Sequence, residues 1–176
     1  MVIRKFRETL KRKRWAVDGY RAVRNGPKTL LYRLSPVWLA RCRFRMETGR
    51  PLDLKNPRTF DEKLLWLMLY WRHPLKTRCA DKYAMRAYVE ERGYGHLLPE
   101  LFGVYERASE IDFDALPERF VLKCTHGCGF NIICKDRRRL DREEVRQRLD
   151  AWMMIDFSEE YGEIHYAGIR PRIICE

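Results

Sequence analysis

Residues 120–136 read F-V-L-K-C-T-H-G-C-G-F-N-I-I-C-K-D. A β-favouring run stands at each end of this stretch, around a loop of small residues at 125–129. We therefore predict two strands joined by a short loop. Glycines let such a loop approach an anion and turn backbone N–H groups toward it. Lys123 and Lys135 add point charges for phosphate oxygens, so the stretch is a candidate phosphate cradle.

The same pattern is equally typical of a plain β-hairpin whose turn contains Gly127 and Gly129. The chain has neither a G-x-x-x-x-G-K-[ST] motif nor a G-x-G-x-x-G motif that leads from a strand into a helix. A nucleotide at this loop would therefore bind between strands and not at a helix N-terminus. Both interpretations, phosphate cradle and plain hairpin, stay open on residue types alone.

Potential zinc ligands also lie in this stretch, namely Cys124, His126, Cys128 and Cys134. Their C-x-H-x-C spacing is not a standard zinc pattern, because alternate strand positions point to opposite faces. We expect no metal site here and interpret the cysteines as small buried thiols. Without a secretory signal pattern, the 6 cysteines of the chain do not predict disulfides.

The net charge of +11 is concentrated near the N-terminus. Residues 1–50 hold 15 Lys and Arg against 3 Asp and Glu, whereas residues 51–176 hold 21 against 22. Residues 1–24 indicate a basic helix, which fits a solvated helix packed on its own domain, an interfacial helix on an anionic membrane, or an arm that touches nucleic acid. The neutral remainder makes nucleic acid the weakest of the three.

No apolar run reaches the roughly 18 residues of a transmembrane helix, and the N-terminus lacks the pattern of a secretory signal. We therefore expect a cytoplasmic protein that can lie at the inner face of the membrane through residues 1–24. The length of 176 residues fits one domain, or one small domain with an extension.

Apolar periodicity and breaks place further elements along the chain. We expect helices over 28–46, 59–71, 75–93 and 141–155, strands over 97–105 and 170–175, and irregular structure over 157–168.

Capping signals set several of these boundaries. Thr59 and Glu62 match a capping box, and Asp141 is a good N-cap. Consecutive apolar residues over 64–71 indicate a helix buried on most sides. His73 precedes a proline and is interpreted as a surface or capping residue.

Four ordered motifs carry a family resemblance. They are N-P-x-T-F-x-E-K-L-x-W-L at 56–67, D-K-Y-A-x-R-x-Y-V at 81–89, F-V-L-K-C-x-H-G-x-G-x-N-I-I-x-K-D at 120–136 and P-R-I-I-C-E at 171–176. At this spacing the chain resembles the TupA-like ATP-grasp family over about residues 51–176.

The resemblance implies an α+β fold of the type found in the N-terminal portion of ATP-grasp enzymes, with a helical lead-in and a small antiparallel sheet with helices. We accordingly expect a basic helical arm at 1–50, a helical lead-in at 51–97 and a partial nucleotide-binding subdomain at 98–176. The half that carries the Mg²⁺ ligands would follow Glu176. We therefore expect that the C-terminal half is missing and that this chain alone is inactive.

ATP-grasp enzymes hold ATP between two subdomains and use Mg²⁺ to activate a carboxylate as an acyl-phosphate, which an amine then attacks. TupA-like members are associated with cell-surface polysaccharide assembly. The resemblance therefore implies the ATP-binding portion of a carboxylate–amine ligase. The alternatives are a glycosyltransferase-like polysaccharide protein and a non-catalytic module that binds a membrane or a polyanion. Catalytic residues stay unassigned, and the Mg²⁺ ligands are expected beyond the chain end.

The resemblance also assigns binding roles by position. Lys123 resembles the strand lysine that reaches the ATP phosphates and the adenine edge, and Lys82 resembles a second phosphate-side lysine. Glu176 falls where the hinge strand lines the adenine pocket. The mobile loop over the β- and γ-phosphates is matched by His126, Gly127, Cys128 and Gly129.

Cys128 departs from the family pattern, which usually has serine at this position. The thiol removes a good hydroxyl donor but keeps a small side chain, and the backbone N–H groups of the loop remain. We therefore expect phosphate binding to be weakened and not abolished.

Overall fold

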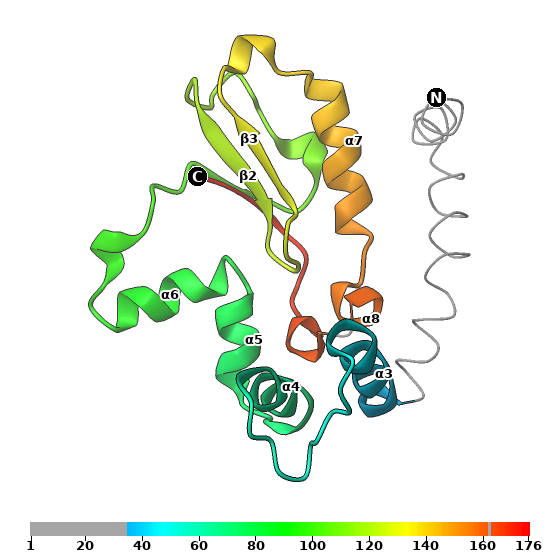
Figure 1. Cartoon of the computed structure of the whole chain (residues 1–176). Helices are drawn as coiled ribbons and strands as arrows, with labels where there is room; N and C mark the ends of the chain where they lie inside the picture. Colours follow the sequence, from blue (N-terminus) through cyan, green and yellow to red (C-terminus); the bar gives the residue numbers. More distant parts are fainter. Residues whose placement is uncertain (1–34, 162) are drawn as a thin grey trace, which may run out of the picture. The chain divides into compact units, whose positions relative to one another are not determined.

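The computed structural model describes residues 35–161 and 163–176 of the chain. The basic helix expected over 1–24 and the helix start expected at residue 28 lie outside these residues. The chain divides into two compact units, the first ending at Leu69 and the second spanning Tyr70–Glu176. Figure 1 shows the helices and strands of both units.

The first unit is built on helix α3 (Pro36–Thr48). Ser35 caps its start, since the side-chain oxygen accepts a hydrogen bond from the backbone N–H of Trp38 at 3.2 Å. Gly49 ends it in the left-handed conformation with φ 72° and donates its N–H to the carbonyl of Arg45. Four apolar residues, Phe44, Leu52, Leu54 and Leu69, form the buried cluster of this unit.

Helix α4 (Phe60–Tyr70) begins as the sequence predicts. The N–H of Glu62 donates to Thr59 Oγ1 at 3.3 Å, and the N–H of Thr59 donates to Glu62 Oε2 at 2.9 Å. The capping box is therefore confirmed. The expected burial on most sides is wrong, because Leu69 is the only buried residue of α4 and Leu64 is 44% exposed. Apolar residues lie on all sides of α4, and the small buried cluster of this unit covers only the side that carries Leu69.

The helix expected over 75–93 is two helices, α5 (Pro74–Ala80) and α6 (Ala84–Glu91). His73 caps α5 by accepting the N–H of Leu75, as predicted for a capping residue. Asp81 breaks the helix because its carboxylate accepts the backbone N–H groups of Tyr83 at 2.8 Å and Ala84 at 3.2 Å. A short side chain that binds nearby amides in this way competes with helix continuation.

The second unit contains a four-stranded antiparallel sheet in the order β1-β4-β2-β3. The strands are β1 (Gly103–Tyr105), β2 (Phe120–Cys124), β3 (Asn131–Cys134) and β4 (Ile173–Cys175). The predicted hairpin of β2 and β3 is confirmed. The strand expected over 97–105 is shorter, because Leu97 ends the 3₁₀ helix η1 (Gly95–Leu97) and residues 98–102 form no regular structure before β1.

One face of this sheet packs on the core and the other carries the polar residues of the candidate site. Along β2, Leu122 and Cys124 are fully buried, whereas Val121 and Lys123 on the opposite face are half-buried. Helix α7 (Arg142–Met153) runs beside β2 and covers the core face with Val145 and Leu149 (Figure 1).

Short helices replace the irregular structure expected after α7. Helix α8 (Phe157–Tyr161) and the 3₁₀ helix η4 (Ile164–Tyr166) carry aromatic rings into the core. Phe130 stacks on Trp152 with 5.4 Å between ring centroids and meets Phe157 edge-on at 5.4 Å. Aromatic packing of this kind orders the segment. The pattern of polar and apolar residues along the sequence does not predict such packing.

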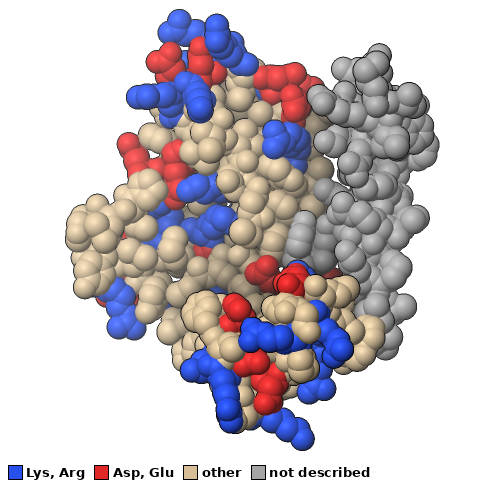
Figure 2. Space-filling view, in the orientation of Figure 1, with Lys and Arg blue, Asp and Glu red and all other residues tan. Residues whose placement is uncertain are grey.

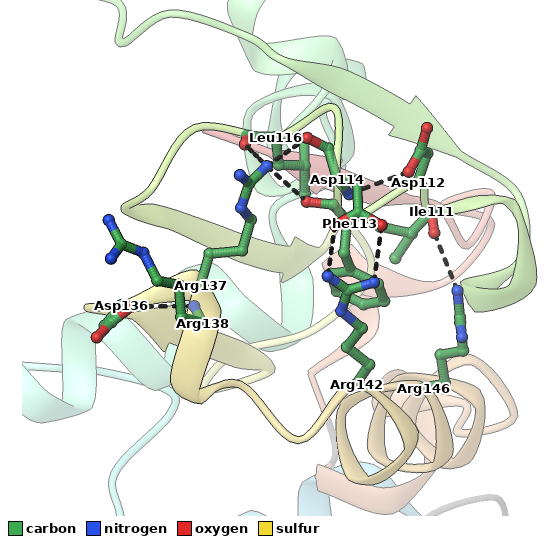
Figure 3. A network of polar contacts seen from close by, with 10 residues as sticks. All are labelled: Ile111, Asp112, Phe113, Asp114, Leu116, Asp136, Arg137, Arg138, Arg142 and Arg146. Carbon is green, nitrogen blue, oxygen red and sulfur yellow. Dashed lines mark hydrogen bonds and ion pairs between the residues drawn. The ribbon is translucent and has the colours of Figure 1, made fainter.

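Three arginines hold the segment 111–116, which joins η2 (Ala108–Glu110) to β2 (Figure 3). Arg137 donates to the carbonyls of Phe113, Asp114 and Leu116, Arg142 pairs with both carboxylate oxygens of Asp114 at 2.9 and 2.5 Å, and Arg146 donates to the carbonyl of Ile111 at 3.2 Å. The segment is therefore fixed by charge-assisted hydrogen bonds in place of regular structure.

Candidate functional site

The β2–β3 register places Lys123 beside the loop and Lys135 far from it. Lys123 pairs with Asn131 next to the loop, whereas Cys134, the neighbour of Lys135, pairs with Phe120 at the other end of the hairpin. A strand rises about 3.3 Å per residue, so the two lysines stand roughly 12 Å or more apart. The expected cradle with a lysine on each side is wrong for Lys135.

Gly127 allows the loop to lie directly on the aromatic core. A Cβ at this position would come within 2.6 Å of Phe157 Cδ2 and 2.7 Å of Phe130 Cε2. Gly129 has φ +75°, a conformation that L-residues with a side chain rarely adopt. The shape of this loop therefore requires a glycine at 127, and the backbone conformation favours one at 129.

The loop also presents backbone donors. Within the described residues, the backbone N–H groups of Gly127, Cys128 and Gly129 donate no hydrogen bond. The neighbouring amides of Cys124 and Thr125 are taken up by the carbonyls of Phe130 and Arg172 at 2.9 Å each. Successive unused N–H groups in a glycine loop suit an anion.

Lys82 binds the backbone carbonyls on both sides of the loop turn. Its ammonium donates to the carbonyl of Cys124 at 3.0 Å and to the carbonyl of Gly127. Burial lowers the pKa of Lys82 from its usual value. An ammonium has three N–H donors, and the loop carbonyls accept two of them.

Lys123 and Glu176 form the second part of the site. The carboxylate of Glu176 pairs with the ammonium of Lys123 and with Arg86 Nη1 at 2.6 Å. Arg86 also donates to the carbonyl of Pro99 at 2.7 Å. Glu176 is bound by both cations with its side chain only 8% exposed, whereas that of Lys123 is 32% exposed. The partly exposed Lys123 is therefore positioned by the buried ion pair of Arg86 and Glu176.

Backbone pairing brings Glu176 to this place. The N–H of Val121 donates to the carbonyl of Glu176 at 2.6 Å, and the N–H of Glu176 donates to the carbonyl of Val121 at 2.9 Å. Glu176 thus extends β4 along β2, two residues from Lys123. The alternation of a strand then puts both side chains on one face.

The side chain of His126 anchors the loop to the end of α7. Its imidazole is 3% exposed, and Nε2 donates to the carbonyl of Trp152 at 3.1 Å. In the described part of the chain, Nδ1 is buried without a hydrogen-bond partner. Burial lowers the pKa of His126, so the neutral ring is favoured.

The cysteines divide between the core and the surface. Cys124, Cys134 and Cys175 are buried, and burial raises the pKa of the Cys124 thiol to about 12. Cys128 is exposed in the loop. Within residues 35–161 and 163–176, no group of three or more His, Cys, Asp or Glu is placed to hold a metal ion.

Some residues of the site were missed from the sequence. Arg86 and Tyr83 lie inside the D-K-Y-A-x-R motif, and Arg172 lies inside P-R-I-I-C-E, yet neither motif alone shows which partner each residue meets. The structure places Arg86 against Glu176 and Arg172 over the ring of Tyr83. The presence of these residues in the motifs was the available signal.

The described surface is not uniformly basic. Figure 2 shows Lys and Arg mixed with Asp and Glu at the end of the second unit where the 3₁₀ helix η3 (Arg137–Arg139) lies. Arg138 meets Glu118 at 3.5 Å, and Arg139 meets Asp136 at 3.8 Å. In the part of the chain that the structure covers, no helix combines the length and apolar character needed to cross a bilayer.

A family model described as TupA-like ATPgrasp matches residues 62–176. Comparisons with curated proteins and with solved structures found no match. The matched residues include the D-K-Y motif, the β2–β3 hairpin and β4, which together form the site described above. The chain therefore belongs to the TupA-like ATP-grasp family.

Proposed function

We propose that the second unit binds ATP on the polar face of its sheet, as part of an ATP-grasp protein of the carboxylate–amine ligase type. The observation that carries this proposal is the partly exposed side chain of Lys123, whose ammonium pairs with Glu176 beside a glycine loop with unused N–H groups. Charge-assisted hydrogen bonds from lysine and loop amides are the contacts that phosphates prefer.

Each described residue has a place in this proposal. Lys123 and the amides of 127–129 would hold phosphate oxygens, and Lys82 would add its remaining N–H donor. Glu176 would line the adenine end, where its carboxylate also orients Lys123. His126 would keep the loop in place through Trp152. The chemistry that ATP supplies, when bound with Mg²⁺, is phosphoryl transfer to a carboxylate.

The biological setting is proposed on family membership. TupA-like proteins are associated with cell-surface polysaccharide assembly, so we propose that the carboxylate and amine belong to building blocks of such a polymer. The division into an arm at 1–50, a lead-in at 51–97 and a nucleotide-binding part at 98–176 is part of the same proposal. Mg²⁺ would reach this site together with the nucleotide.

Ligand-induced stabilisation tests the proposal. Saturating MgATP at about 100 times Kd stabilises a binding protein by roughly 2.7 kcal/mol, which raises Tm by several degrees at this size. We expect this rise for the wild type and for Lys135→Ala, whose lysine lies away from the loop. We expect no rise for Lys123→Ala. An equal rise in all three proteins would reject the role of Lys123, and no rise in the wild type would reject ATP binding.

A further inference from the structure

Arg172 differs from the neighbouring arginines because no carboxylate neutralises it. Arg86 pairs with Glu176 and Arg170 pairs with Glu106, whereas Arg172 forms no ion pair among the described residues. Its Nε atom is buried and has no hydrogen-bond partner within that part of the chain. The guanidinium therefore keeps its charge and its donors.

An aromatic ring holds this guanidinium in position. The Cζ atom of Arg172 lies 4.8 Å from the centroid of the Tyr83 ring. A planar guanidinium stacked on an aromatic face is oriented before a ligand arrives. Tyr83 directly follows Lys82, the residue that binds the loop carbonyls.

Backbone contacts place Arg172 next to the phosphate loop. The N–H of Thr125 donates to the carbonyl of Arg172 at 2.9 Å, and the N–H of Arg172 donates to Thr125 Oγ1 at 3.1 Å. The N–H of Lys82 approaches the carbonyl of Thr125 at 3.4 Å. Thr125 therefore joins Lys82 and Arg172 at the first residue of the loop.

Strand alternation puts Arg172 on the polar face of the sheet. Ile174 pairs with Lys123, and Arg172 precedes Ile174 by two residues, so the three share one face. Glu176, two residues further along, shares it as well. The order along this face is thus Glu176, Lys123 with Ile174, and then Arg172 beside the loop.

The local charge indicates an anionic ligand. Four cations gather here, namely Lys82, Arg86, Lys123 and Arg172, against the carboxylates of Asp81 and Glu176 and that of Asp156, which acts on His126 in the loop. Asp81 already accepts two backbone amides, and Glu176 is shared by two cations. Positive charge therefore remains at the loop end of the face.

We propose that Arg172 is a further phosphate-binding residue, whose guanidinium takes the polyphosphate chain of the nucleotide and favours tri- and diphosphates over monophosphates. This inference rests on the proposed function. A guanidinium fork matches two phosphate oxygens at once, which an ammonium does not. The guanidinium stacked on Tyr83 would thus increase affinity for nucleotides with two or three phosphates more than for monophosphates.

Calorimetric titration with MgATP, AMP and tripolyphosphate tests the inference on four proteins: wild type, Arg172→Gln, Arg172→Lys and Arg170→Gln. Arg170 is the matched control. It lies two residues before Arg172 on the same segment, but its side chain pairs with Glu106. We expect Arg172→Gln to lose about tenfold or more in affinity for MgATP and tripolyphosphate, the size of one charge-assisted contact. AMP affinity should not change, and Arg172→Lys should recover part of the loss.

The outcomes separate this inference from the proposed function. Equal MgATP affinity in the wild type and both Arg172 variants would overturn the role of Arg172 while leaving ATP binding intact. Loss of AMP and ATP affinity in equal proportion would also overturn it. Tripolyphosphate binding that depends on Arg172, without any binding of ATP or AMP, would support the phosphate subsite and reject the nucleotide. If Arg172→Gln does not fold, a folded Arg172→Lys with unchanged MgATP affinity would still contradict the inference.

Discussion

At Gly127, a methyl group in place of the α-hydrogen would meet the rings of Phe157 and Phe130 at 2.6 and 2.7 Å. Contacts this short require the rings or the loop to move. The rings cannot yield easily, because Phe130 also stacks on Trp152 and Phe157 packs against the tilted ring of Tyr166. The same glycine offers its carbonyl to Lys82, so a shift here would reach the candidate site.

Gly127→Ala should therefore destabilise the protein by about 1–3 kcal/mol, the usual cost of overpacking a filled core. Gly129→Asn is the control, because no atom lies within 4 Å of a Cβ at Gly129 and asparagine tolerates its positive φ. Urea unfolding of both variants measures the difference. Equal stability of Gly127→Ala and the wild type would show that the loop does not press on the rings.

Lys82 is a second residue whose role follows from its contacts. Replacing it by methionine leaves the carbonyls of Cys124 and Gly127 without their donor. We expect a loss of about 1–3 kcal/mol, the cost of unsatisfied polar groups. Lys135→Met, at an exposed lysine, should change stability little. A Lys82→Met protein as stable as the Lys135→Met control would reject the supporting role.

The lowered pKa of His126 makes the free energy of unfolding depend on pH. Its folded pKa is lowered by burial, so between the unfolded value near 6.5 and the lower folded value the unfolded chain binds a proton that the native chain does not. Stability from this residue is thus present above the unfolded pKa and falls as pH decreases below it. The neutral ring is the form that donates Nε2–H to Trp152 and leaves Nδ1 unprotonated.

Comparison of the wild type with His126→Gln in urea at pH 7.5 and 5.0 measures this effect. Glutamine keeps an amide donor for the carbonyl of Trp152 but does not titrate. The wild type should lose more stability on acidification than the variant does. The same loss in both proteins would mean that His126 takes up its proton without cost.

At the scale of elements, Asp81 separates α5 from α6. Its buried carboxylate accepts the N–H groups of Tyr83 and Ala84, while its own N–H donates to the carbonyl of Thr77. The resulting turn directs Lys82 to the loop and Tyr83 to Arg172. In one continuous helix over 75–93, the side chains of Lys82 and Tyr83 would point in directions set by the helix and not by this turn.

Asp81→Ala should cost about 1–2 kcal/mol, the typical value of an N-cap. Asp81→Asn keeps a side-chain oxygen for the same amides and should recover most of this loss. Thermal unfolding monitored by circular dichroism compares the two variants with the wild type. If Asp81→Asn is as unstable as Asp81→Ala, the carboxylate acts through its charge and not through the cap.

At the scale of the whole molecule, local signals predicted local structure. The capping box of Thr59 and Glu62, the N-cap at Asp141 and the hairpin around 125–129 are all confirmed, because each depends on residues close in sequence. The burial of α4 and the break at Asp81 were missed. The burial of α4 depends on which surfaces meet in space, and residue types do not show this. The break at Asp81 rests on local hydrogen bonds from Tyr83 and Ala84, but the same residue types also fit a continuous helix, so the sequence does not decide between the two.

The candidate site shows the same division. Lys123 and the glycine loop were identified from one continuous stretch, whereas the pairing of β4 with β2 brings in residues about fifty positions away. That pairing joins Glu176 to Lys123 and Arg172 to Thr125, a step that needs the sheet order β1-β4-β2-β3. The misplacement of Lys135 has the same origin, since only the strand register shows which end of the hairpin it occupies.

If the backbone amides of 127–129 receive phosphate, titration of ¹⁵N-labelled protein with MgATP will show it at those amides. We predict that the amide resonances of Gly127, Cys128 and Gly129 shift as ATP is added, because their N–H groups gain an acceptor. The amides of Gly49 and Gly168, which lie outside this loop, serve as internal controls and should not move. ATP binding that shifts other amides and leaves these three unchanged would mean that the loop amides do not hold phosphate.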